Sequence, residues 1–142
     1  MAQFTDTIGG TFDAKKTRVS VPAAYRQLLT QMGATALVLR KSSHSECIEI
    51  WPQPDFEREV NRRIEALDPF APDYNRRVAK LVGRASTLSP DADGRIVIPA
   101  PLIAHAGLEG EVSFAGRAKF FELWHAPKLV AHEAAMDAED AA

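Results

Sequence analysis

The stretch Asp91-Ala92-Asp93-Gly94-Arg95-Ile96-Val97-Ile98-Pro99-Ala100 decides the fold, and an earlier stretch has the same pattern. The earlier copy reads Asp13-Ala14-Lys15-Lys16-Thr17-Arg18-Val19-Ser20-Val21-Pro22-Ala23. Each copy has a polar turn ending in Arg, a short strand with apolar residues at every second position, and a Pro suited to the start of a helix. Asp and Gly supply turn chemistry in the second copy.

The repetition continues beyond these two stretches. Pro22 and Pro99 are 77 positions apart, while Glu49-Ile50-Trp51 returns 73 positions later as Glu122-Leu123-Trp124. The spacing between the copies thus shrinks from 77 to 73 positions along the chain, so the second copy is shorter. This difference predicts a helix shorter by nearly one turn and a hairpin shorter by one residue in the second copy. Register kept across strand, helix and hairpin predicts a duplicated unit with pseudo-twofold symmetry.

Apolar periodicity predicts the secondary structure of both copies and of the segment between them. The predicted strands cover 8–12, 19–21, 37–40, 47–51, 85–88, 95–98, 111–115 and 120–124. Helices are predicted from Pro22 to near Gly33, around 56–67, around 74–82, at 101–106 and from near Pro127. The chain then divides into a first repeat (7–54), a helical connector (55–82), a second repeat (83–127) and a C-terminal helix and tail (128–142).

Composition predicts a cytoplasmic globular protein. The 142 residues are 46% hydrophobic, with no apolar run at the start and no stretch of transmembrane length. The single cysteine, Cys47, excludes an internal disulfide and indicates a reducing compartment.

Charge is distributed unevenly along the chain. The net charge is +2 over residues 1–51, +1 over 52–84 and −5 over 85–142. A protein that binds nucleic acid through a uniformly positive surface is therefore excluded, and any such binding must come from a local basic loop, multiplied by oligomerisation.

The two turns differ in charge and therefore in expected role. The first carries Lys15, Lys16 and Arg18 against one acid, Asp13, so it fits either DNA contact or a merely solvated turn. In the second, Arg95 lies beside Asp91 and Asp93, which favours a structural Asp–Arg turn stabilised by Gly94 over DNA contact.

Other candidate residues have plainer interpretations. A helical basic stripe fits a solvated helix face, a subunit contact or a DNA phosphate contact; its members are Arg76, Arg77, Lys80 and Arg84. Trp51 and Trp124 fit core or interface anchors. The histidines have no metal-ligand spacing with Cys47; they are His44, His105, His125 and His132. Because no nucleophile stands in a recognisable catalytic context, we expect no metal, no cofactor, no small-molecule substrate and no enzymatic activity.

Taken together, these motifs resemble the MraZ family within the SpoVT/AbrB-like superfamily of transcription factors. The resemblance rests on Asp91-x-x-Gly94-Arg95 followed by Ile98-Pro99, on Arg18-x-x-Val21-Pro22, on the two Trp strand ends and on Gly83-Arg84-Ala85. It covers nearly the whole chain.

This resemblance implies an α+β fold in which the two repeats form a swapped-hairpin-like β-barrel flanked by helices. It also implies ring-like homo-oligomers that bind double-stranded DNA at direct repeats upstream of the division and cell-wall gene cluster, chiefly as a repressor in the nucleoid. By the same resemblance, the DNA contacts fall on Arg18, on Lys15 and Lys16, and on Arg95 as the second-copy equivalent. Exposed apolar residues around Phe56, Phe70 and Tyr74 are expected to need a partner surface as well.

The first turn departs from the family pattern. It is one residue longer than the second, and Thr17 stands where the pattern has Gly. Because a β-branched residue resists a positive φ, we expect this loop not to copy the Gly turn, with the extra residue absorbed as a bulge. The altered turn and the acidic total charge leave a second hypothesis, an oligomeric interaction scaffold with weakened DNA specificity.

Overall fold

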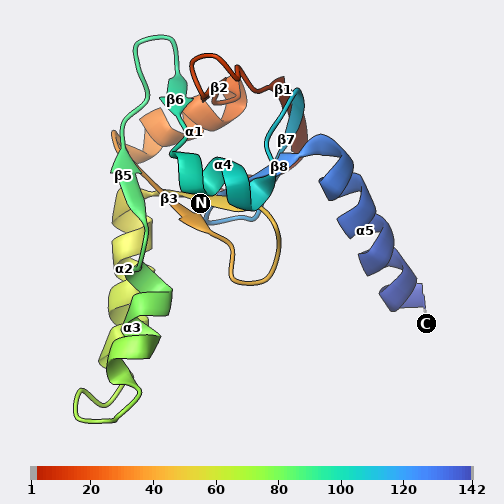
Figure 1. Cartoon of the computed structure of the whole chain (residues 1–142). Coiled ribbons are helices and arrows are strands. Elements are labelled where there is room, and N and C mark those ends of the chain that lie inside the picture. The colour runs from red at the N-terminus through yellow and green to blue at the C-terminus, as the bar shows by residue number, and fades with distance from the viewer. Residues whose placement is uncertain (1–2, 142) are drawn as a thin grey trace.

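The protein is described by a computed structural model over residues 3–141, in which a β-sheet carries helices on both faces (Figure 1). The sheet has six antiparallel strands in the order β1-β7-β8-β4-β3-β5. Its strands are β1 (Thr7–Thr11), β3 (Leu37–Lys41), β4 (Ile48–Pro52), β5 (Ser86–Leu88), β7 (Glu111–Gly116) and β8 (Phe121–His125). Strands β2 (Arg18–Ser20) and β6 (Arg95–Val97) pair with each other in a separate antiparallel ribbon. The α+β class is as predicted.

The two halves of the chain exchange their first strands. β1 pairs with β7 of the second half, and β5 pairs with β3 of the first half. β4 and β8 meet at the centre of the sheet, and β2 meets β6 in the ribbon. The strand order therefore reads the same when equivalent strands of the two halves are interchanged, which is the pseudo-twofold symmetry expected from the repeat.

The expected β-barrel does not close within residues 3–141. β1 and β5 are the two edges of the six-stranded sheet, and the ribbon is not hydrogen-bonded into that sheet as a ladder. The strands that would complete a ring, β2 and β6, have only three residues each and use their ladder on one another. The arrangement is an open sheet with a ribbon across one face.

Helices α1 (Ala23–Met32) and α4 (Ala100–Ala106) occupy equivalent places in the two halves. Each follows a Pro in extended conformation, Pro22 or Pro99, which lies one residue before the helix. Each also ends at a Gly in the left-handed region, Gly33 or Gly107. α4 has 7 residues and α1 has 10, so the predicted loss of nearly one turn is confirmed.

The main core lies between the sheet, the ribbon, α1 and α4. Alternating strand residues point into it, including Ile48, Ile50 and Leu123 from the two central strands. An aromatic group lies at its centre, where the ring centroid of Tyr25 is 5.3 Å from that of Phe4 and 4.7 Å from that of Phe121. Burial of Tyr25 is the main cause that raises the pKa of its hydroxyl, which donates to the carbonyl oxygens at positions 5 and 6.

The opposite sheet face is covered by two separate helices. α2 (Gln53–Glu65) packs Phe56 and Val60 on Val38, while α5 (Ala126–Ala141) packs Leu129 against Trp124. Phe56 is therefore 7% exposed and does not need a partner surface, contrary to expectation, whereas Phe70 is 93% exposed. α3 (Tyr74–Val82) lies along α2, and Figure 1 shows this pair projecting from the body as a helical hairpin.

Two carboxylates lie opposite each other at the centre of this second face. Glu49 of β4 is paired in register with Glu122 of β8, and both side chains are buried. Each accepts a hydrogen bond from the indole N–H of the Trp two residues later, at 3.0 Å in both halves. Arg117 also donates to Glu122, at 2.8 Å from Nε, so the central carboxylates are held by hydrogen bonds and an ion pair.

Candidate nucleic-acid interface

The two turn arginines lie on the outward face of the β2–β6 ribbon. Val19 and Ile96 face the core at 2% and 1% exposure, so their strand neighbours point the other way. In the register of the ribbon Arg18 is opposite Val97, and Ser20 is opposite Arg95. Arg18 and Arg95 therefore lie diagonally across one small face.

The loop that leads into β2, here called loop 1 (residues 13–18), is closed at its base and basic at its tip. The backbone of Asp13 pairs with that of Arg18 through hydrogen bonds of 2.9 and 3.2 Å. One carboxylate oxygen of Asp13 accepts the amides of Lys15 and Lys16, at 3.0 and 3.3 Å. Asp13 therefore serves the loop backbone, and its other carboxylate oxygen lies 3.9 Å from Nε of Arg18.

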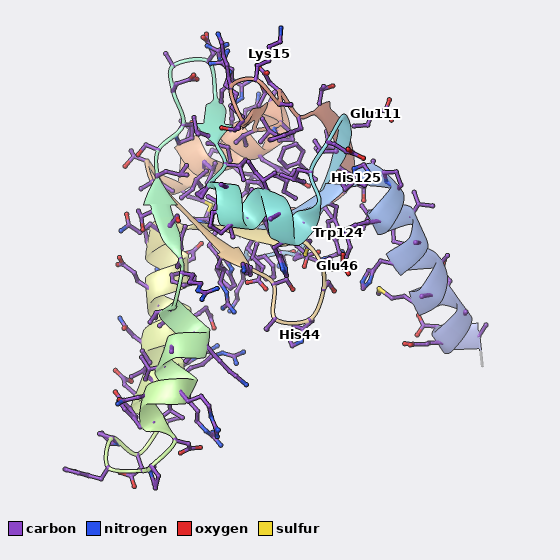
Figure 2. The ribbon with its side chains drawn as sticks, in the orientation of Figure 1. Lys15, His44, Glu46, Glu111, Trp124 and His125 are labelled. Carbon is purple, nitrogen blue, oxygen red and sulfur yellow. The ribbon has the colours of Figure 1, made fainter. Side chains whose placement is uncertain are left out.

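The lysine side chains of loop 1 point away from the body. Lys15 and Lys16 are exposed, and within residues 3–141 no carboxylate lies within 4.0 Å of either ammonium group. Figure 2 shows Lys15 at the end of the molecule opposite the tip of the α2–α3 hairpin. Loop 1 thus presents free positive charge beside the outward face of the ribbon.

Thr17 has a φ of 51°, so the expectation that this residue avoids the left-handed region was wrong. Its equivalent, Gly94, has a φ of 78°. Loop 1 can adopt this conformation because the Asp13 carboxylate and the Asp13–Arg18 backbone pair fix both ends, while the Thr17 hydroxyl donates to the carbonyl of Lys16 at 2.8 Å. The longer loop thus reaches the strand through a residue with positive φ, as the Gly turn does.

The loop before β6, here called loop 2 (residues 91–95), is acidic, and its one arginine pairs with both of its acids. Arg95 contacts both of its carboxylates, at 3.1 Å to Asp91 and 2.7 Å to Asp93. Asp91 also accepts the amides of Asp93 and Arg95, each at 2.9 Å. The hydrogen bond from the Arg95 amide is the largest cause that lowers the pKa of Asp91. Loop 2 offers a guanidinium group already held in place by two acids.

Each loop is tied to the strand end of the other copy. The amide of Val21 donates to the carbonyl of Gly94 at 2.9 Å, and the amide of Ile98 donates to that of Thr17 at 2.7 Å. The two left-handed residues therefore form a reciprocal pair of backbone contacts. These bonds fix the loops relative to the ribbon and hence Arg18 relative to Arg95.

Sequence reasoning missed three residues of this face. Arg26 of α1 reaches across to loop 2, where it donates to the carbonyl of Asp93 at 3.3 Å. Ser20 and Val97 complete the outward ribbon face, and Val97 is 58% exposed. The alternation around Val19 and Ile96 could have identified Ser20 and Val97, but no local pattern signals the contact of Arg26 with a loop 67 residues away.

Other chemistry has little support in the described part of the chain. Residues 3–141 contain no group of three His, Cys, Asp or Glu side chains arranged to hold a metal ion. Burial raises the pKa of the Cys47 thiol, which makes it a poor nucleophile. Within the same residues, no helix combines the length and the apolar character needed to cross a membrane.

Comparison with known proteins identifies related chains. A family model described as "MraZ protein, putative antitoxin-like" matches residues 81–140. A protein of Rickettsia bellii (strain OSU 85-389), named transcriptional regulator MraZ, is 37% identical over 110 residues, covering 78% of this chain and 73% of its own length.

Two further relatives have the same name. The protein of Rickettsia rickettsii (strain Sheila Smith) is 34% identical over 128 residues, covering 84% of this chain and 85% of its own length. That of Gluconobacter oxydans (strain 621H) is 38% identical over 128 residues, with coverages of 88% and 77%.

Proposed function

This chain belongs to the MraZ family, as its motifs predicted, and from that premise we propose that it is a transcriptional regulator that binds double-stranded DNA sequence-specifically. It is a regulator and not an enzyme, in keeping with the name of its relatives. The observation that carries the proposal is the outward face of the β2–β6 ribbon, flanked by the un-neutralised lysines of loop 1.

Loop 1 is the proposed phosphate-contacting element. Lys15 and Lys16 supply charges without acidic partners, and contacts of this kind make binding strong at low salt and weak at high salt. They carry no sequence information by themselves, because every base pair has the same phosphates.

Arg18 is the proposed base reader. A two-stranded ribbon fits the major groove, and the planar guanidinium can donate two hydrogen bonds to the edge of a guanine. The 3.9 Å separation from Asp13 is longer than a hydrogen bond, so the Arg18 head can leave this carboxylate for DNA. Val97, opposite Arg18, adds an apolar surface that suits a thymine methyl group.

Arg95 is proposed to act chiefly as a turn partner, with a weaker share in DNA contact. Its guanidinium would have to leave two carboxylates, and those acids would then lie near DNA phosphates. Asp13, Asp91 and Gly94 are proposed to be structural turn residues. The division into repeats 7–54 and 83–127, connector 55–82 and tail 128–142 also remains our proposal.

One loop with three basic residues gives little affinity, so the proposal includes a ring-like homo-oligomer. Several loops on one assembly would engage several direct repeats and raise affinity through effective concentration. The proposed DNA sites are direct repeats upstream of its own gene, in the division and cell-wall gene cluster. There the protein acts as a repressor. We place it in the cytoplasm, associated with the nucleoid. No small molecule or membrane enters this function.

A gel-shift titration tests the function. The upstream DNA of the division and cell-wall cluster and a scrambled duplex of equal composition are each titrated with protein, at several salt concentrations. We expect at least tenfold tighter binding to the natural repeats. Equal and negligible binding to both duplexes, by a protein that light scattering finds oligomeric, would instead favour an interaction scaffold with weakened DNA specificity.

A further inference from the structure

A basic groove lies between α2 and α3, far from the ribbon. It has a volume of about 620 Å³, and the apolar residues Leu67 and Leu81 line it. The cationic residues around it are Arg63, Arg76, Arg77 and Lys80. Loop 1 lies at the opposite end of the molecule from the hairpin tip, so this is a second positive surface (Figures 1 and 2).

Most of these cations have no acidic partner within the protomer. Arg77 pairs with Asp73, with 2.7 Å between Nε and Oδ2. Within residues 3–141 no carboxylate lies within 4.0 Å of the charged groups of Arg63, Arg76 or Lys80. Three exposed like charges around an apolar floor favour a ligand that is both acidic and apolar.

α3 is also incompletely packed for a helix of its pattern. Its apolar residues Tyr74, Val78 and Leu81 recur on one side and are half-buried, with Leu81 packed against the cluster of Phe56 and Val60 on α2, and none of them is fully buried. A soluble amphipathic helix normally buries that side, because most helical stability comes from packing. Part of the apolar side of α3 therefore stays open to a contact from outside the protomer.

α5 has the complementary surface. Its first turns are fixed to the body by buried Leu129, by an ion pair of 2.6 Å between Lys128 and Glu46, and by His132 packed on Trp124. Its remaining turns leave the body, as Figure 1 shows, and present Met136 at 45% exposure beside acids at helical spacing. Those acids are Glu133, Asp137, Glu139 and Asp140.

The charges of α5 are unfavourably placed for an isolated helix. A helix C-terminus carries partial negative charge and is stabilised by cations, but the last turn of α5 has no basic residue. Asp137 and Asp140 instead add negative charge there. Cations from another molecule would offset this repulsion and hold the projecting turns in helical form.

We propose that the projecting end of α5 of one copy docks in the α2–α3 groove of a second copy. The acids of α5 meet the free cations of the groove, and Met136 meets the apolar floor near Leu81. Because the two surfaces are different, the contact is head-to-tail and generates a ring or a filament. This inference rests on the proposed function only for the existence of an oligomer, and it assigns the contact that builds it.

DNA is the other ligand that a basic groove suggests. The apolar residues that line the groove, the partly exposed apolar side of α3 and the opposite charge of α5 all favour a helix over a phosphate backbone. DNA contact in this groove is therefore treated as an outcome of the test.

Charge reversal and its rescue test the docking. Light scattering measures the mass of the full chain carrying Glu133→Lys, Asp137→Lys and Asp140→Lys, of a second variant carrying Arg76→Glu and Lys80→Glu, and of the combined variant. We expect each single set to lower the mass toward the 15.6 kDa protomer and the combination to restore the assembly. Glu109→Lys with Glu111→Lys changes two exposed acids elsewhere and should leave the mass unchanged.

A neutral variant, Glu133→Gln, Asp137→Asn and Asp140→Asn, guards against misfolding caused by three added lysines. It should keep the circular dichroism of the parent and still lose mass. Unchanged mass in this variant, or a protein that is monomeric throughout, overturns the docking.

DNA binding is measured on the same variants so that the two proposals can fail separately. Dissociated variants should still bind a duplex with one short repeat as tightly as the parent binds that duplex per protomer, since loop 1 is unchanged. If the groove variant keeps its mass but loses DNA, the groove is a DNA contact and the docking is wrong. If dissociation and rescue occur but no variant, nor the parent, binds DNA, the docking stands and the proposed function fails.

Discussion

Loop 1 and loop 2 place different residues in the same left-handed conformation, and this sets different constraints on each. Thr17 has a β-carbon at a φ where L-residues are disfavoured by roughly 1–2 kcal/mol. Gly94 has no such strain, but a β-carbon there would overlap the side chain of Arg26. The first position therefore holds a β-carbon at the cost of strain, and at the second a β-carbon would also collide with Arg26.

Thr17→Gly is expected to raise the free energy of unfolding by up to about 1 kcal/mol, because relief of strain exceeds the added freedom of the unfolded chain. Gly94→Ala should lower it by about 1–3 kcal/mol through strain and the collision with Arg26. Urea unfolding of both variants measures the difference. A stabilised Gly94→Ala protein would show that Arg26 is free to move away.

Four alanine variants separate the roles of the two turns. Arg18→Ala should lose preference for the natural repeats with little change in stability, since its contact with Asp13 is long. Lys15→Ala or Lys16→Ala should weaken binding to all DNA and flatten its salt dependence, as expected for phosphate contacts. Arg95→Ala should cost about 1 kcal/mol of stability, because two partly exposed ion pairs are lost.

Binding titrations and thermal melts of these four variants give the answer. An Arg95→Ala protein that folds normally but no longer binds DNA, beside an Arg18→Ala protein that binds like the parent, would reverse the assignment. Loop 2 would then be the part that reads the sequence.

At the scale of the elements, the central strands β4 and β8 combine a buried polar pair with the core. Glu122 accepts from the fully packed Trp124 and from Arg117 at 2.8 Å, whereas Arg40 lies 3.7 Å from Glu49 and Trp51 is only half-buried. The Glu122–Trp124 pair of the second half is thus more buried and more closely held than the Glu49–Trp51 pair of the first half. We therefore expect it to contribute more to stability.

Glu122→Ala is expected to lower the free energy of unfolding by about 1–3 kcal/mol, because a buried indole N–H loses its acceptor. Glu49→Ala is the matched control and should cost less, since Trp51 can reach water. Chemical denaturation followed by tryptophan fluorescence measures both. Equal losses would mean that the burial of the indole N–H does not decide the cost, since relief of the repulsion between the two facing carboxylates favours both variants equally.

Local patterns predicted the elements well, for reasons visible in particular residues. Pro22 and Pro99 stand before helices, Gly33 ends one, and the strands follow the period of two, so each signal lies within a few residues of its effect. Even the missing turn of α4 followed from spacing alone.

Long-range pairings were beyond such patterns. The exchange of β1 and β5 between halves depends on register with distant strands. The partners of β1 lie 100 to 108 residues away along the chain, those of β5 lie 47 to 51 residues away, and nothing in Thr7–Thr11 specifies β7. The open sheet and the Arg26 contact have the same origin. The indole–carboxylate bonds join residues only two apart, but they depend on a side-chain orientation that the sequence pattern does not specify. The prediction for Thr17 was wrong for a different reason. Hydrogen bonds at both ends of loop 1 outweigh the preference of a β-branched residue for negative φ. The roles of Lys15, Lys16, Arg18 and Arg95 in DNA contact stay predictions.

At the scale of the whole molecule, the exchanged strands make each half incomplete without the other. Residues of both halves share the main core, and each half would leave its own sheet edge unpaired. We therefore expect a single cooperative unfolding transition for the intact chain.

Separate fragments test this dependence directly. A fragment of residues 1–82 and one of residues 83–142 should each be largely unfolded alone, and equimolar mixing should restore strand and helix signals. Circular dichroism and one-dimensional NMR follow the recovery. A folded 83–142 fragment that remains monomeric would show that the second half needs no strand from the first.

The reciprocal ribbon joins two loops that occupy symmetric places but differ in charge and length. If two identical half-chains built the ribbon and its two loops, every substitution would appear twice. This surface would then match only palindromic DNA sites. Joining the halves in one polypeptide removes that obligation, so one loop can keep the turn rigid while the other varies toward a ligand. The ribbon with its two loops is therefore not twofold-symmetric. Rotated by half a turn, it presents a different face to the same duplex. Successive copies would then have to bind along DNA in the same orientation.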